Sequence, residues 1–95
     1  MSMRDQFEWD ENKNKQNIKK HGIDFQDAKT IFSAPMLVKI DDEVEEEDRW
    51  VGIGMVRGVA MVVVFTEPGE YKIRIISVRK ATKQERKSYE EKIRY

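Results

Sequence analysis

A run of seven apolar residues, 59–65, constrains the fold of this chain more than any other feature of its sequence. The run has no polar alternation, so the strand that it forms must be covered on both faces, which is typical of the central strand of a sheet. Arg57-Gly58 before the run predicts a tight hairpin, and residues 67–70 after it place Pro and Gly at the centre of a type II turn. The sequence therefore predicts an antiparallel meander with this strand in its middle.

Four further segments have the apolar patterns of strands: residues 6–9, as a short edge strand, then 36–40, 50–56 and 71–80. Gly52 and Gly54 flatten one strip of the sheet, which suits either a bound nucleotide or a closely packed helix. In the last segment Ile75 and Ile76 are adjacent apolar residues. Either both faces of that strand are covered there, or a bulge reverses its alternation.

Capping residues predict two helices in the N-terminal part of the chain. Asp10 lies where an N-cap is needed, before a polar helix over residues 11–20 that Gly22 ends in a left-handed conformation. Asp24 repeats the N-cap signal before a second helix over residues 25–33, in which apolar side chains recur at helical spacing.

A third helix is predicted at the C-terminus. Thr82 and Glu85 have the spacing of a capping box, and the helix that they start runs to about residue 94. Its apolar pair, Tyr89 and Ile93, is small, so its docking should be shallow. The fold class is therefore α+β, with residues 1–95 forming one domain in which a small antiparallel sheet carries two N-terminal helices and a C-terminal helix.

Opposite charges are concentrated in the two halves of a chain whose net charge is zero. Residues 1–50 hold 8 basic and 13 acidic side chains, whereas residues 51–95 hold 10 basic and 5 acidic ones. Seven of the acidic residues lie within 41–48 and predict an extended, self-repelling loop. The basic C-terminal half suits a polyanion such as nucleic acid, or an acidic protein.

No segment of the chain is predicted to enter a membrane. The longest apolar run is far shorter than the roughly 20 residues of a membrane-spanning helix. The polar start of the chain, residues 1–6, has no signal-peptide core. We therefore expect a cytoplasmic protein that does not contact a membrane.

The types of residue present exclude several kinds of catalytic site and suit a site that acts on phosphate groups. The chain has no Cys and one His, which excludes a cysteine nucleophile and a paired-histidine metal site, and it has no Gly-rich phosphate loop. The acidic segment lacks the Gly-punctuated spacing of a calcium loop, so neither a metal nor another cofactor is predicted. Arginine and lysine remain, and converging guanidinium and ammonium groups stabilise the charge of a phosphodiester transition state.

Two stretches of the sequence carry a resemblance to a known family. The first consists of Phe7-Glu8-Trp9-Asp10, Lys13, Asn17, Lys20-His21-Gly22-Ile23-Asp24-Phe25 and Ala28, and the second of Ile75-Ile76-Ser77-Val78-Arg79-Lys80-Ala81-Thr82, Glu85-Arg86 and Tyr89. In these residues the sequence resembles the BrnT family, toxins of type II toxin-antitoxin modules, over positions 7–91. The resemblance implies a RelE-like fold and an endoribonuclease that a small antitoxin silences.

The resemblance also implies the residues of the site. The implied catalytic residues are Lys20 or His21 for proton transfer, with Arg49, Arg74 and Arg79 for phosphate charge. The residues expected to bind RNA are Lys80, Lys83, Arg86 and Tyr89. On a regular strand Arg74 and Arg79, five residues apart, face opposite sides of the sheet, and a bulge between them would remove this conflict.

The expected reaction is cleavage without a metal, in which an RNA 2′-hydroxyl attacks the adjacent phosphorus and leaves a 2′,3′-cyclic phosphate and a 5′-hydroxyl. The expected partners are RNA and a BrnA-like antitoxin, in either a homodimer or a toxin-antitoxin hetero-oligomer. Two alternatives stay open. One is a non-catalytic module that binds nucleic acid or docks an antitoxin through the same basic strand and helix, and the other is a toxin fold that has lost activity.

Overall fold

The computed structural model describes residues 6–41 and 49–93. Its elements in chain order are β1 (Gln6–Glu8), α1 (Glu11–His21), α2 (Phe25–Ala28), the 3-10 helix η1 (Lys29–Ser33), β2 (Leu37–Ile40), β3 (Trp50–Val56), β4 (Val59–Gly69), β5 (Lys72–Lys80) and α3 (Lys83–Ile93). Nearly all of the predicted acidic loop and the predicted last residue of the C-terminal helix lie outside the described residues. No helix in the described ranges is long and apolar enough to cross a bilayer.

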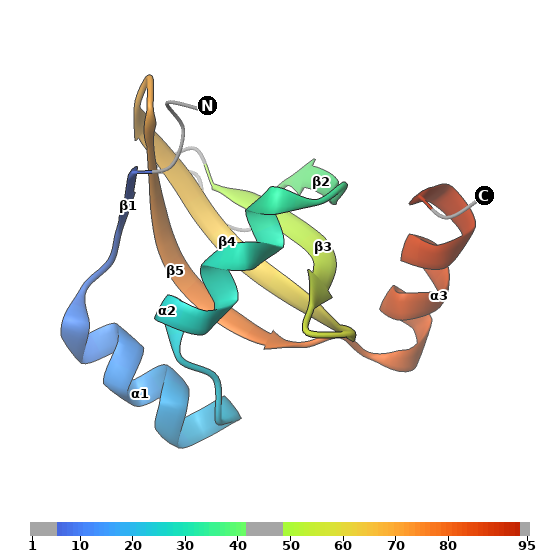
Figure 1. Cartoon of the computed structure of the whole chain (residues 1–95), viewed down its shortest axis with the longest axis horizontal. Helices are drawn as coiled ribbons and strands as arrows, with labels where there is room; N and C mark the ends of the chain where they lie inside the picture. The colour runs from blue at the N-terminus through green and yellow to red at the C-terminus, as the bar shows by residue number, and fades with distance from the viewer. Residues whose placement is uncertain (1–5, 42–48, 94–95) are drawn as a thin grey trace.

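The strands form one sheet in the order β1-β5-β4-β3-β2 (Figure 1). The pairs β2–β3, β3–β4 and β4–β5 are antiparallel, which confirms the predicted meander. Successive residues Val62 and Val63 of β4 are 2% and 0% exposed, so this central strand is covered on both faces. Arg57 and Gly58 both have positive φ, at 50° and 81°, as a two-residue hairpin turn requires.

The prediction of an entirely antiparallel sheet is wrong, because β1 pairs with β5 in parallel. The connection between these strands contains three helical segments and three strands, and so long a connection does not impose a hairpin reversal. Phe7 of β1 packs on Phe32, with ring centroids 5.5 Å apart, while Glu8 forms an ion pair with Arg74 of β5. An apolar contact on one face and an ion pair on the other thus hold β1 in a mixed sheet.

A bulge in β5 decides between the two alternatives for Ile75 and Ile76. The register of β5 against β4 shifts at this point and leaves Ile76 without a counterpart. Ile75 and Val78 consequently both belong to the core although they are three residues apart. Arg74 and Arg79 each neighbour one of these core residues, so both project from the opposite face of the sheet.

The turn between β4 and β5 lies later than predicted. β4 continues to Gly69, and the reversal occurs at Glu70 and Tyr71 instead of at residues 67–70. The register between Thr66 and Gly69 is shifted, so Pro68 lies in an interruption of the ladder. Proline has no N–H to donate to a ladder, and it is tolerated at such an irregularity.

The caps predicted for the first helix are confirmed. The Asp10 carboxylate accepts hydrogen bonds from the backbone N–H groups of Asn12 and Lys13, at 2.8 and 3.2 Å. Gly22 has φ of 71° and its N–H donates to the Ile18 carbonyl. These local signals fix both ends of α1.

The second predicted helix, residues 25–33, is only partly α-helical. Asp24 caps it as expected, but the α-helix ends at Ala28 and continues as the 3-10 helix η1. The Thr30 hydroxyl donates to the Asp27 carbonyl at 3.2 Å and competes with the regular ladder. Thr30 and Ile31 are also β-branched, which lowers their preference for an α-helix.

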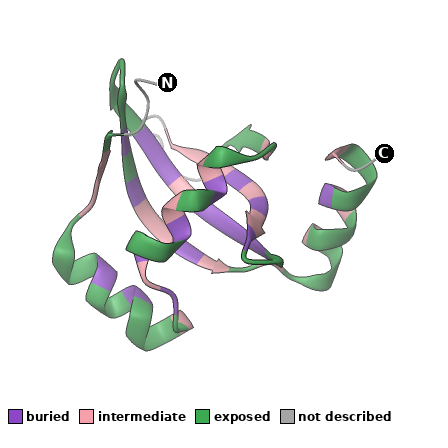
Figure 2. Cartoon of the chain, viewed as in Figure 1, coloured by how far each residue is buried: buried purple, intermediate pink, exposed green. Residues whose placement is uncertain are grey.

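The hydrophobic core lies between the sheet and the helices α2 and η1 (Figures 1 and 2), and the buried residues of α1 beside it are the polar Asn14 and Asn17. Figure 2 shows buried residues along the strands and on the surfaces of α1 and α2 that face them. A Cβ atom at Gly54 would lie 2.7 Å from Cγ1 of Ile31, and one at Gly52 would lie 2.6 Å from Sδ of Met36. The two glycines therefore admit a closely packed helix and the segment after it, the second of the two alternatives predicted for them.

The side chain of Asn17 fastens α1 to β5 beyond the end of β1. Its Nδ2 donates to the carbonyls of Val78 and Ile23, at 2.9 and 3.0 Å, and its Oδ1 accepts from the Val78 N–H at 3.1 Å. Asn17 is only 6% exposed. The buried amide therefore pairs with Val78 as the peptide group of a neighbouring strand would, one residue before Arg79.

Candidate functional site

A groove of about 940 Å³ lies over the sheet face opposite the core, between that face and α3. Its apolar floor consists of Val51, Ile53, Val62 and Val64, and β2 lines one side. Its polar lining from β5, α3 and the connection between them consists of Ser77, Arg79, Thr82, Gln84, Glu85, Ser88 and Lys92. An apolar surface with a few polar groups at one end is typical of a binding site.

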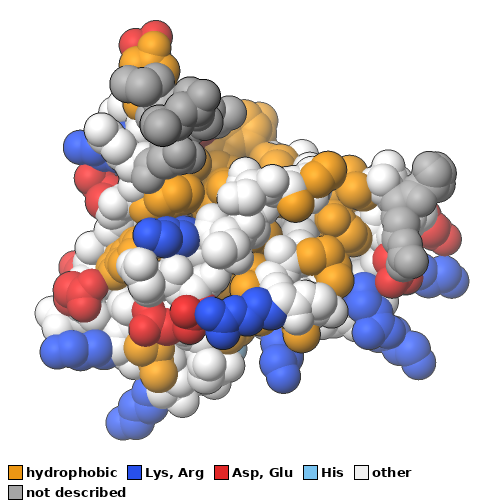
Figure 3. Space-filling view, viewed as in Figure 1, with side chains coloured by type: hydrophobic (Ala, Val, Ile, Leu, Met, Phe, Trp, Pro, Cys, Tyr) orange, Lys and Arg blue, Asp and Glu red, His pale blue; other side chains and the backbone are white. Residues whose placement is uncertain are grey.

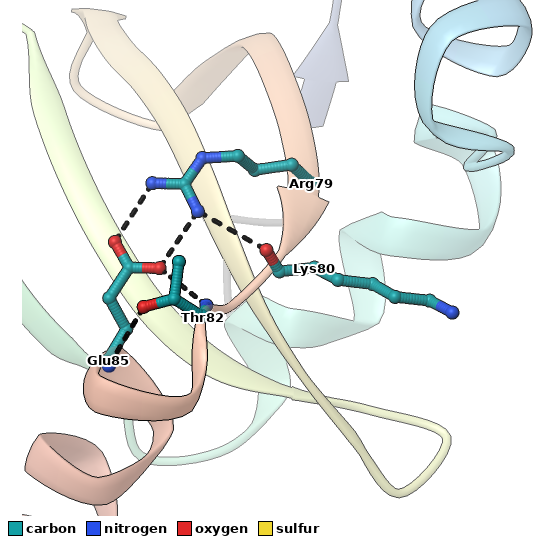
Figure 4. A network of polar contacts seen from close by, with 4 residues as sticks. All are labelled: Arg79, Lys80, Thr82 and Glu85. Carbon is teal, nitrogen blue, oxygen red and sulfur yellow. Dashed lines mark hydrogen bonds and ion pairs between the residues drawn. The ribbon is translucent and has the colours of Figure 1, made fainter.

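The guanidinium of Arg79 is the most firmly held basic group in this groove (Figure 4). Its Nη1 and Nη2 donate to Oε1 and Oε2 of Glu85, at 2.8 and 2.9 Å, and Nη1 also donates to the Lys80 carbonyl at 3.2 Å. Glu85 belongs to the first turn of α3. The pair therefore joins the end of β5 to the start of the next helix.

This pairing leaves one edge of the Arg79 guanidinium available. A guanidinium has five N–H donors in a rigid plane, and Glu85 uses the end-on edge formed by Nη1 and Nη2. The N–H of Nε and the second N–H of Nη2 form the side-on edge, and among the described residues neither has a partner. Two parallel N–H donors match two oxygens of a phosphate group.

The same contacts fix the charges of the two residues. The hydrogen bonds from Arg79 lower the pKa of Glu85 to about 2, against the opposing effect of desolvation. The hydrogen bonds to Glu85 in turn raise the pKa of Arg79. Glu85 is therefore a carboxylate near neutral pH and does not serve as a proton donor there.

Acidification is expected to remove the stability that this ion pair provides. The folded-state pKa of Glu85 is lower than its ordinary value of 4.5, so the carboxylate stabilises the fold above pH 4.5, and this contribution is lost as the pH falls from 4.5 to about 2. The melting temperatures of the wild-type protein and Glu85→Gln should differ at neutral pH and converge toward pH 2. If the difference in melting temperature between the two proteins stayed constant from neutral pH to pH 2, the lowered pKa of Glu85 and its ion pair with Arg79 would be contradicted.

The structure does not bring Lys20 and His21 together with Arg79. Both lie at the C-terminal end of α1, where Lys20 is exposed and His21 half-buried, and neither lines the groove. Lys80 is exposed and extends to the other side of β5 from Arg79 (Figure 4). The expected groups for proton transfer and for phosphate charge thus lie on different surfaces.

Arg74 and Arg49 also lie outside the groove lining. Arg74 is on the same face as Arg79, but a strand rises about 3.3 Å per residue, so roughly 15 Å separate their Cα atoms. The Arg74 guanidinium pairs with Glu8 of β1, whose pKa is lowered by hydrogen bonding to it. Arg49 precedes β3, and its carbonyl accepts a hydrogen bond from the Asp41 N–H at 2.8 Å.

The predicted RNA-binding residues of α3 have two different environments. Lys83 and Arg86 are exposed, and Figure 3 shows Lys and Arg side chains around α3 and along the lower edge of the molecule. Tyr89 is 7% exposed, and its hydroxyl donates to the Pro35 carbonyl at 3.1 Å. In this structure Tyr89 anchors α3, whereas Lys83 and Arg86 are accessible to a partner.

Sequence reasoning identified Glu85 as a helix cap and missed its contact with Arg79. The capping box is confirmed, since the Thr82 N–H donates to Oε1 of Glu85 at 2.8 Å and the Glu85 N–H donates to the Thr82 hydroxyl at 3.1 Å. The missed signal is an arginine at the end of a strand, three residues before the box. The described residues contain no group of three or more His, Asp or Glu side chains placed to hold a metal ion.

Fold and groove together define a small α+β protein with an arginine-lined groove on the sheet face opposite its core. A model of the family described as the ribonuclease toxin, BrnT, of type II toxin-antitoxin systems matches residues 9–85. The chain therefore belongs to the BrnT family, which confirms the resemblance found in the sequence.

One solved structure agrees with this assignment. The chain is similar to the 1.1 Å crystal structure of the Brucella abortus ribonuclease toxin, BrnT, with 31% sequence identity and a TM-score of 0.63. The similarity covers 82% of this chain and 97% of the Brucella chain. Comparison with curated proteins gives no match.

Proposed function

We propose that this chain is a toxin that cuts RNA in the groove beside α3, by a metal-independent reaction centred on Arg79. The observation that carries the proposal is the free side-on edge of the Arg79 guanidinium, held by Glu85 at one end of an apolar floor. Membership of a ribonuclease toxin family supports the choice of RNA as the substrate.

In the proposed reaction the RNA supplies its own nucleophile. The 2′-oxygen loses its proton and forms a bond to the adjacent phosphorus, while the bond from phosphorus to the 5′-oxygen breaks and that oxygen takes up a proton. The products are a 2′,3′-cyclic phosphate and a 5′-hydroxyl. Negative charge grows on the two non-bridging oxygens, and the paired N–H donors of Arg79 stabilise it there.

The proposal includes a cognate antitoxin of the BrnA type and a RelE-like fold. A mostly antiparallel sheet, with α2 and η1 on one face and a groove between the other face and α3, supports the RelE-like relation. The exposed basic side chains of α3, such as Lys83 and Arg86, suit an acidic segment of an antitoxin. Assembly with the antitoxin as a hetero-oligomer is part of the same proposal.

Cleavage of purified RNA by the protein is expected to continue in EDTA. The stabilising charge comes from a guanidinium, so chelation should leave the rate within about twofold of that in buffer without EDTA. The new ends should be a cyclic phosphate and a 5′-hydroxyl, the latter labelled by a polynucleotide kinase without prior dephosphorylation. An RNA of the same sequence with 2′-O-methyl groups is the matched control and should remain intact.

Two results would refute this mechanism. Loss of cleavage in EDTA with recovery in magnesium would assign the chemistry to a bound metal, and cleavage of the 2′-O-methyl RNA would exclude the internal nucleophile. RNA that is bound but stays intact at every protein concentration would identify the chain as a binding module.

A further inference from the structure

The carboxylate of Glu85 is held at both of its oxygens. Oε1 accepts from Nη1 of Arg79 and from the Thr82 backbone N–H, each at 2.8 Å, and Oε2 accepts from Nη2 of Arg79 at 2.9 Å. The Glu85 N–H is itself fixed by the Thr82 hydroxyl at 3.1 Å. The first turn of α3 therefore presents a rigid acceptor to the end of β5.

Arg79 needs such a support because of its position. Its side chain is 41% exposed and projects over an open groove from near the last residue of β5. An arginine side chain has several rotatable bonds, and an unsupported one would sample many rotamers. The two hydrogen bonds to Glu85 select one rotamer, the one whose Nε–Nη2 edge is turned away from Glu85 (Figure 4).

From this geometry we propose that Glu85 is a positioning residue for RNA cleavage. It sets the orientation of Arg79 and does not touch the substrate. The inference rests on the proposed function, because it assigns Glu85 a role through the arginine that binds the phosphate.

The role has a consequence that a purely structural helix cap does not share. The negative charge of Glu85 lies beside the site that takes an anionic phosphate, so it opposes RNA binding while it orients the donor. Glutamine in its place removes the repulsion between this charge and the phosphate. It also has only one side-chain oxygen, so it cannot accept both hydrogen bonds from Arg79. RNA affinity should therefore stay the same or rise, whereas turnover should fall, because a small misplacement of a catalytic group lowers the rate strongly.

The test compares Glu85→Gln with two control variants of the full chain on a defined RNA. Glu85→Gln should lower kcat at least about tenfold with KM and RNA affinity unchanged or lower. Glu91→Gln removes an exposed carboxylate from the same helix, and Asp10→Ala removes the cap of α1; both should keep kcat within about twofold. In the Arg79→Lys background, Glu85→Gln should cause no further loss of kcat.

A second measurement follows the Arg79 side chain directly. The Nε–H of Arg79 should give a resolved signal in a 15N–1H NMR spectrum of the wild-type protein, and this signal should broaden or move to the position of free arginine in Glu85→Gln. An unchanged signal overturns the inference even if no RNA is cut.

The outcomes separate this inference from the proposed function. If Arg79→Lys loses activity but Glu85→Gln keeps wild-type kcat, Glu85 has no positioning role and the function at Arg79 stands. If Arg79→Lys remains active, both are overturned. If Glu85→Gln loses kcat equally in the wild-type and Arg79→Lys backgrounds, Glu85 acts by another route and the inference is wrong.

Discussion

Arg79→Lys is expected to lower the rate of RNA cleavage by about 100-fold while the protein remains folded. Lysine keeps the positive charge but has no planar fork, so it does not bind Glu85 with one edge and a phosphate with the other. Loss of one well-aligned donor to a developing oxyanion typically costs about 100- to 1000-fold in turnover. Initial rates on a defined RNA, with melting curves of both proteins, measure the effect.

Arg57→Lys is the matched control for this substitution. Arg57 lies at the hairpin between β3 and β4, its side chain is 77% exposed, and it pairs with Asp27 at 3.3 Å. An exposed ion pair contributes little to stability, so Arg57→Lys should have the wild-type melting temperature and rate. If Arg79→Lys also kept a rate within about twofold of the wild type, Arg79 would be a surface residue and the groove would need another catalytic group.

The parts of the fold that the sequence predicts correctly are determined by neighbouring residues. The caps at Asp10 and Gly22, the capping box at Thr82 and the hairpin at Gly58 depend on side chains within four positions of the backbone that they satisfy. The signal for the central strand is also local, because its own consecutive apolar residues require a position that is covered on both faces of the sheet.

The parts that the sequence does not predict depend on contacts between distant segments. The parallel direction of β1 follows from the packing of Phe7 on Phe32 and from its ion pair with β5. The later turn at Glu70 follows from the register between β4 and β5, which no local pattern displays. The change to a 3-10 helix at Lys29 is an exception, because its causes at Thr30 and Ile31 are local. The parallel β1 and the later turn change an edge of the sheet and one connection, and the predicted pairing of β3, β4 and β5 is unchanged.

In the candidate site, too, some features can be predicted from the sequence and others depend on contacts between distant segments. The resemblance of the sequence to a family was sufficient to single out Arg79, and the structure places it in the groove. The separation of His21 from Arg79 depends on how α1 packs, and the Glu85 contact depends on where α3 lies; neither is visible in residue spacing. Residue types therefore indicate the chemistry, and packing decides which side chains act together.

Asn17→Ala is expected to lower the free energy of unfolding by about 3 kcal/mol. The substitution removes three buried hydrogen bonds and leaves the N–H and C=O of Val78 without partners, and each unsatisfied buried group costs about 1–3 kcal/mol. For a domain of this size, about 3 kcal/mol corresponds to a fall in melting temperature of roughly 15 °C. Urea unfolding with a shared m-value measures the change.

Asn12→Ala on the same helix separates the lost hydrogen bonds from the change of residue type. Asn12 is exposed, and alanine has the higher helix propensity, so this variant should be as stable as the wild type or slightly more stable. If Asn17→Ala were no less stable than Asn12→Ala, the amide would not be holding β5. If the large loss occurs, the end of β5 is loosened one residue before Arg79, and RNA cleavage should fall even at temperatures where the variant stays folded.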